Sequence, residues 1–181
     1  MNNKLNGNQA TQLFSSAKKV FKSLDKELSK QSYEYLIKAE ESGGYSIYSK
    51  DQSAPIVVQD DVLKTCMGLL YFEFGVGRQD VGPSWSMPSG YIEDKWQQII
   101  SQVEMPQISP LQSLNKFLDR GSSVYLANDG QTNNTTVVLT NNYSEDCAKH
   151  ISIKASSFSN GLQQANDMAN YCLNNFESTQ Q

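Results

Sequence analysis

Cysteine and histidine are scarce in this chain of 181 residues, which contains three Cys and one His. The cysteines Cys66, Cys147 and Cys172 form no C-x-x-C pair, so a zinc site would be short of its usual ligands. We therefore predict no metal and no cofactor. Three widely spaced cysteines also form no disulfide framework, so we expect reduced thiols and a stability that a reducing agent leaves unchanged.

Positive charge is also in deficit, because the formal net charge is −4 at pH 7. Nucleic-acid binding needs a concentrated cationic face. The chain has one lysine cluster, which consists of Lys18, Lys19, Lys22, Lys26 and Lys30. Asp25 and Glu27 interrupt it, and at helical spacing such a cluster is typical of a solvated helix face. We predict no nucleic-acid partner.

Long apolar runs are missing as well. The residues that follow Met1 are mostly polar and contain no hydrophobic segment of the kind found in signal peptides. The longest nearly apolar run, Met67–Phe74, contains Glu73 and is far too short to span a bilayer. We therefore expect no membrane partner and, together with reduced thiols, a cytoplasmic location.

Aromatic residues, by contrast, are well represented at 10% of the chain, with nine Tyr and seven Phe. Their large side chains supply buried area for a core. A chain of this length removes about 70% of its unfolded surface from water on folding, so it needs no disulfide or metal to be stable. Its apolar residues recur periodically, and no linker divides them. We predict a flexible tail over residues 1–8 and a single globular domain over residues 9–178.

Local patterns indicate an α+β fold. Helical periodicity and capping signals predict helices over residues 8–29, 32–41, 91–102, 110–118 and 159–178. Alternation and turn signals predict strands over Tyr45–Ser49, Pro55–Gln59, Ser123–Asn128, Thr135–Asn141 and Ile151–Ala155. The segment after Asp60 and Asp61 is compatible with a helix over residues 62–74 or with a strand over residues 69–74. We expect a mostly antiparallel sheet of about five strands, packed with N-terminal, central and C-terminal amphipathic helices.

One cysteine and the single histidine provide the one catalytic arrangement with a mechanism. Cys66 lies near the start of the possible helix, where backbone N–H groups and the helix dipole lower a thiol pKa. His150 precedes a predicted strand. A nucleophilic cysteine on a helix with a histidine on a later strand is the topology of papain-like hydrolases and transferases. In the alternative interpretation, Cys66 is a small buried hydrophobe and His150 an ordinary residue at the start of a strand.

A loop rich in glycine and proline is predicted over Gly75–Gly90. Its glycine spacing fits no phosphate-binding motif. Trp85 and Met87 lie between two prolines, which lower the entropy that the loop loses on binding, and Trp is common among interface hot spots. We predict that Arg78, Trp85 and Met87 contact a partner. The alternative is that Trp85 anchors the loop to its own domain.

Two classes of function follow from these patterns. The first is a non-catalytic protein-binding module, such as a small acidic adaptor, a secretion-type chaperone, or an inhibitor or immunity protein. Its partner would be another protein. The second is a Cys–His hydrolase or transferase of papain-like topology, for example a delivered effector, which would use Cys66 and His150. We favour the first class, because no residue on a clear following strand is placed to orient the imidazole of His150.

We predict that the chain unfolds as one cooperative unit, because no linker separates its periodic segments. Calorimetry should give one transition, and limited proteolysis should leave no stable internal fragment. Two resolved transitions together with a protease-resistant piece would contradict the prediction of a single domain.

Overall fold

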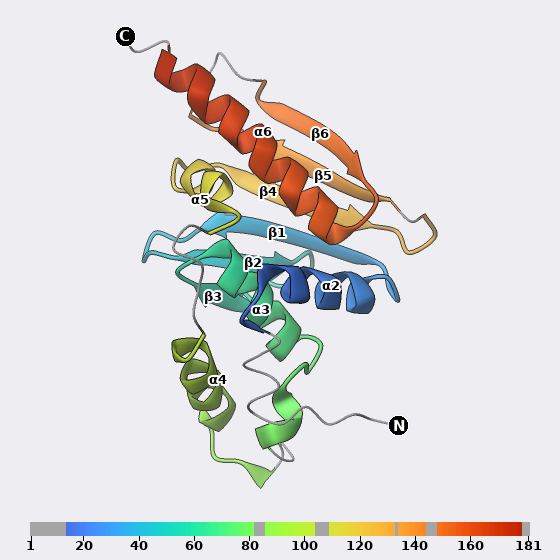
Figure 1. Cartoon of the computed structure of the whole chain (residues 1–181), viewed down its shortest axis with the longest axis vertical. Coiled ribbons are helices and arrows are strands. Elements are labelled where there is room, and N and C mark those ends of the chain that lie inside the picture. Colours follow the sequence, from blue (N-terminus) through green and yellow to red (C-terminus); the bar gives the residue numbers. More distant parts are fainter. Residues whose placement is uncertain (1–13, 82–85, 104–108, 133, 144–147, 179–181) are drawn as a thin grey trace.

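The computed structural model describes residues 14–81, 86–103, 109–132, 134–143 and 148–178 (Figure 1). The predicted tail over residues 1–8 lies outside them. The described elements are α2 (Ala17–Leu28), β1 (Tyr33–Ala39), β2 (Tyr45–Ser49), β3 (Val57–Gln59), α3 (Val62–Phe72), the short 3-10 helix η1 (Arg78–Val81), α4 (Tyr91–Ser101), α5 (Gln112–Leu118), β4 (Ser123–Asn128), β5 (Thr135–Thr140), β6 (His150–Ala155) and α6 (Phe158–Ser178).

The strands form one antiparallel sheet in the order β3-β2-β1-β4-β5-β6. Two three-stranded meanders, β1-β2-β3 and β4-β5-β6, are joined where β1 pairs with β4. Helices α2, α3, α5 and α6 lie over the same face of this sheet (Figure 1). The α+β class and the antiparallel sheet are therefore confirmed, with six strands in place of about five.

Strand β1 replaces the helix predicted over residues 32–41, and that prediction was wrong. Burial alternates along the segment, with Tyr33, Tyr35 and Ile37 buried and the residues between them half-buried. This period of two is that of a strand with one covered face. The segment bonds to β2 on one side and to β4 on the other, so two long-range pairings override its local helical signals.

The segment after Asp61, for which both a helix and a strand were possible from the sequence, forms helix α3. Its N-cap is Asp61, whose side chain accepts a hydrogen bond of 2.7 Å from the N–H of Leu63. Nearly the whole helix is buried, which explains why its sequence is apolar on every side and shows no helical period. At Gly68 a Cβ atom would come within 2.3 Å of the Val57 side chain, so the absent side chain lets α3 lie directly on β3.

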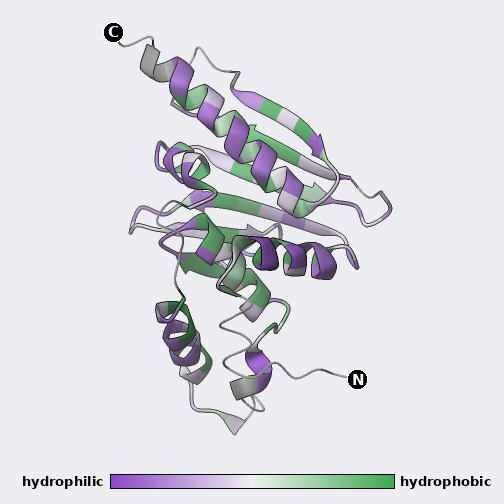
Figure 2. Ribbon diagram, viewed as in Figure 1, coloured by the Kyte–Doolittle hydropathy of each residue, from purple (hydrophilic) through white to green (hydrophobic). Residues whose placement is uncertain are grey.

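The helix predicted over residues 8–29 is present as α2, but it begins only at Ala17, after an extended Ser16, and residues 8–13 of that prediction lie outside the described residues. The remaining predicted helices and strands agree with the structure to within about two residues. Helix α5 begins at Gln112, two residues after the predicted start, while the hydroxyl of Ser109 accepts from the N–H of Leu111. Helix α6 begins at Phe158, one residue before its predicted start. The core lies between the sheet and the helices that cover it. Figure 2 shows many hydrophobic residues in the strands and hydrophilic residues along α2 and α6. The predicted loop over Gly75–Gly90 contains the short 3-10 helix η1 within its described residues.

Helix α2 is tied to α6 by a carboxylate. Asp25 accepts a 3.0 Å hydrogen bond from the N–H of Ser159 in the first turn of α6, and the Ser159 hydroxyl donates to the same carboxylate. A negative charge in this place satisfies a backbone N–H that the helix leaves unpaired and stabilises the helix dipole. Asp25 thus turns toward the body of the protein and away from the outer surface of α2.

The cysteines differ from the expectation that all three are reduced. Cys172 of α6 is disulfide-bonded and fully buried, whereas Cys66 is a free buried thiol. Cys147 lies outside the described residues. Sequence spacing could not reveal the disulfide, because two cysteines pair when the fold brings their Cα atoms to about 5–6 Å, whatever their separation along the chain.

Reduction of the Cys172 disulfide should destabilise the fold, contrary to the expectation from sequence. A native disulfide contributes about 2–4 kcal/mol by restricting the unfolded chain, which corresponds to several degrees of melting temperature. Thermal unfolding followed by circular dichroism, with and without dithiothreitol, measures the effect. The Cys172→Ala variant is the control, since its melting should not respond to the reductant. Equal melting temperatures for the oxidised and reduced wild type would refute this prediction.

Candidate functional site

The structure does not bring Cys66 and His150 together. Cys66 lies in α3, which packs on β2 and β3 through Thr65 and Gly68. His150 begins β6, at the opposite edge of the sheet, where its Nδ1 lies 3.3 Å from the Thr140 hydroxyl. Since β2 and β6 are four strand positions apart, the two elements are separated by about 19 Å.

The environment of Cys66 also differs from that of a nucleophile. Its side chain is fully buried, and burial raises the pKa of the thiol, with the nearby Asp61 carboxylate as a second, smaller cause. A thiol in this setting stays protonated at neutral pH, and the thiolate is the reactive form. Cys66 therefore fits the alternative interpretation of a small apolar core residue.

The loop residues predicted to contact a partner are only partly described. Trp85 lies outside the described residues, and Met87 is half-buried. Arg78 belongs to η1, and its guanidinium donates a hydrogen bond of 3.5 Å to the backbone carbonyl of Phe72 at the end of α3. The involvement of these three residues in partner binding stays a prediction.

A different surface stands out on the sheet face opposite the helices, which we call the open face. Strand register places four large side chains in one line across four neighbouring strands. Leu36 of β1 pairs with Tyr48 of β2 and with Tyr125 of β4, which in turn pairs with Val138 of β5. We call these four residues the tyrosine row. All four are half-buried, and the row spans three strand spacings, or about 14 Å.

Tyr125 is held in place by an ion pair. Its hydroxyl donates a 2.6 Å hydrogen bond to Oε2 of Glu34, while Oε1 of the same carboxylate lies 2.8 Å from Nζ of Lys50. The bond from Lys50 lowers the pKa of Glu34 most, and the bond from Tyr125 lowers it further. Burial, and then the bond to Glu34, raises the pKa of Tyr125 to about 12.

Tyr48 is held in the same manner on the other side of Leu36. Its hydroxyl donates a 2.6 Å hydrogen bond to Glu40, and Nζ of Lys38 lies 3.9 Å from the same carboxylate oxygen and 4.7 Å from the centre of the Tyr48 ring. Hydrogen bonds from Ser46 and then from Tyr48 lower the pKa of Glu40. At neutral pH both glutamates are therefore ionised, and each accepts a hydrogen bond from a tyrosine hydroxyl and pairs with a lysine.

The arrangement suits binding rather than bond-breaking chemistry. The hydroxyls of Tyr48 and Tyr125 each donate to a glutamate, and these two glutamates pair with Lys38 and Lys50. The sequence analysis did not predict this surface because it assigned residues 32–41 to a helix. Glu34, Leu36 and Lys38 lie on one face only when the segment is a strand. Alternation in Tyr33–Lys38 was the signal that could have revealed it.

The hollows of the protein are open and largely polar. One of about 250 Å³ lies beside α2 and the start of α6, and its lining includes Asp25, Tyr33, Thr135 and Ser157. The hydroxyls of Tyr33 and Thr135 bond to each other at 2.7 Å, and Asp25 is held by Ser159. Among the described residues, no group of three or more His, Cys, Asp or Glu side chains is placed to hold a metal ion.

No protein family model, curated protein or solved structure matches this chain. Within the described ranges, none of the helices has both the length and the apolar character needed to cross a membrane.

We predict that Tyr125 ionises near pH 12 and that Glu34→Gln lowers this pKa while leaving it above 10, because burial, the larger cause, remains. Since the folded pKa is raised, the stability linked to neutral Tyr125 is present below about pH 10 and is lost as the pH rises through about 12. The difference in phenolate absorbance between the wild type and Tyr125→Phe measures the titration. Glu27→Gln, which alters a carboxylate paired with Lys30 on α2, is the control. An unchanged Tyr125 pKa in Glu34→Gln would contradict the assignment.

Proposed function

We propose that this protein is a non-catalytic binding module, of the adaptor, chaperone or inhibitor type, which binds a partner protein through the open face of its sheet. The observation that carries the proposal is the tyrosine row, in which Leu36 lies between two rings that are each fixed by a lysine-paired glutamate.

The composition of the row supports a protein interface. Interface cores are enriched in tyrosine and depleted of charged residues, while charged residues occupy the rim. Here the four residues of the row are uncharged, and Lys38 and Lys50 lie at its border with their glutamate partners. Because each lysine is already paired, a partner that covers the row leaves no isolated charge beneath it.

The fixed hydroxyls also support binding. A side chain that loses rotamer freedom in a complex costs about 0.5–1.5 kcal/mol of binding free energy. Tyr48 and Tyr125 are held before a partner arrives, so a smaller part of this cost remains at association. A row of about 14 Å is the size expected for the central part of an interface that covers about 800 Å² on each partner.

Two predictions from the sequence do not agree with the structure. Cys66 and His150 lie at opposite edges of the sheet, so they do not form a catalytic pair. Cys172 forms a disulfide, and reducing compartments such as the cytoplasm rarely keep such bonds. The loop with Arg78, Trp85 and Met87 stays a second predicted contact region.

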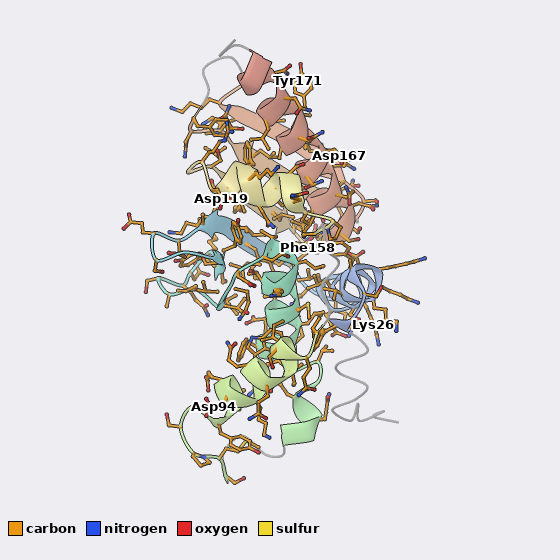
Figure 3. The ribbon with its side chains drawn as sticks, turned by 60° about the vertical axis from the view of Figure 1, so that its left-hand side comes forward. Lys26, Asp94, Asp119, Phe158, Asp167 and Tyr171 are labelled. Atoms are coloured by element: carbon orange, nitrogen blue, oxygen red, sulfur yellow. The ribbon has the colours of Figure 1, made fainter. Side chains whose placement is uncertain are left out.

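Truncation of the row should weaken a partner complex. We expect Tyr48→Ala and Tyr125→Ala each to cost about 2 kcal/mol of binding free energy, as hot-spot truncations do, which is roughly a thirtyfold rise in Kd. Tyr171→Ala is the matched control, because Tyr171 is 62% exposed on α6, away from the open face (Figure 3). The partner is isolated by affinity capture from the native cell, and calorimetry then gives each Kd.

Denaturant unfolding of each variant separates loss of binding from loss of folding. The proposal fails if Tyr48→Ala and Tyr125→Ala fold and bind the captured partner as tightly as Tyr171→Ala does. Trp85→Ala, measured alongside them, tests the predicted loop contact separately. If this variant loses binding while Tyr48→Ala and Tyr125→Ala keep it, the interface lies on the loop.

A further inference from the structure

Helix α2 carries a row of exposed lysines, and the two carboxylates of the same segment bond to other residues. Lys18, Lys19, Lys22 and Lys26 are all exposed, and we call them the lysine ridge. At 3.6 residues per turn they fall within an arc of about 100°, and from Lys18 to Lys26 the ridge is about 12 Å long. In Figure 3 the side chains of α2 beside Lys26 extend away from the body of the protein.

The two acidic residues of this segment do not neutralise the ridge. Asp25 caps the first turn of α6 through Ser159, and Glu27 pairs with Lys30 at 2.7 Å, beyond the end of the helix. Within the part of the chain that the structure describes, the four ridge lysines form no ion pair. Asp25 and Glu27 interrupt the cluster along the sequence, but neither forms an ion pair with a ridge lysine.

The ridge is also rigidly placed. On the opposite side of α2, Val20, Leu24 and Leu28 are buried in the core. Five of the chain's 15 lysines and arginines lie in residues 18–30, although the whole protein has a net charge of −4. A local positive field on an acidic protein attracts anionic partners and repels cationic ones.

We propose that the lysine ridge binds an acidic segment of a partner protein, an inference that rests on the proposed protein-binding function. A segment with carboxylates at i, i+4 and i+8 of a helix matches the length and spacing of Lys18, Lys22 and Lys26. Lipid is a poorer match, because surface-bound helices insert an apolar face, and that of α2 is already buried. A long nucleic acid would extend beyond the ridge onto an otherwise acidic surface.

The test uses a fluorescein-labelled poly-L-glutamate peptide of about 20 residues, long enough to cover the ridge in either helical or extended form. We expect saturable binding at low salt that weakens strongly near 0.15 M salt, where the Debye length is about 8 Å. The triple variant Lys18→Gln, Lys22→Gln, Lys26→Gln should bind about tenfold more weakly, because three exposed charge pairs are lost.

The matched control is Lys116→Gln, Lys149→Gln, Lys154→Gln, which removes the same charge from three exposed lysines on other parts of the chain. It should retain most of the binding. No saturable binding to the wild type, or equal losses in both triple variants, would overturn the proposal. Tighter ridge-dependent binding to a DNA 20-mer or to phosphatidylserine vesicles would overturn it in favour of that ligand.

The same peptide distinguishes this inference from the proposed function. Tyr125→Ala should bind poly-L-glutamate as the wild type does, because the ridge and the open face lie on different sides of the protein. Intact peptide binding with an unaffected partner complex in Tyr125→Ala supports the ridge and refutes the open face. Lost partner binding in Tyr125→Ala without any peptide binding to the wild type refutes the ridge alone.

Discussion

Strand β1 pairs with β2 on one side and with β4 on the other, and this double pairing holds the two halves of the sheet together. It joins two antiparallel meanders into one sheet, and it fixes their register relative to each other. One face of that sheet buries its apolar side chains under the helices. On the other face the same register aligns Leu36 with Tyr48 and Tyr125, so a slip of one residue would turn Leu36 into the core and dissolve the tyrosine row.

Charges on this protein are used in two distinct ways. On the open face each glutamate holds a tyrosine and a lysine together, so the surface around the row is locally neutral. On α2 the carboxylate of Asp25 ties α2 to α6, and among the described residues the four lysines of the ridge form no ion pair. A neutral aromatic surface favours a closely fitting partner, whereas a lysine ridge favours an acidic one through a field that salt weakens.

The described cysteines show how tertiary structure separates chemically identical residues. Cys66 is enclosed by the core of α3, where burial keeps the thiol protonated, and Cys172 is held in a disulfide on α6. Neither is an accessible nucleophile in the folded protein. The disulfide is expected to stabilise a chain whose size already supports a core. Its presence does not agree with the reducing environment expected from the sequence.

Local signals in the sequence were sufficient to predict most of the helices and strands. Asp61 caps α3, alternation and turn residues delimit β2, β4 and β5, and helical spacing places α4 and α6 within a residue or two. Only the fold decided which strands β1 pairs with, that Asp25 turns inward, that Cys172 is oxidised, and that Tyr48, Leu36 and Tyr125 form one row. Each of these depends on residues far apart along the chain. Alternation in Tyr33–Lys38 is compatible with a strand, but it does not indicate which distant segments pair with it or in which register.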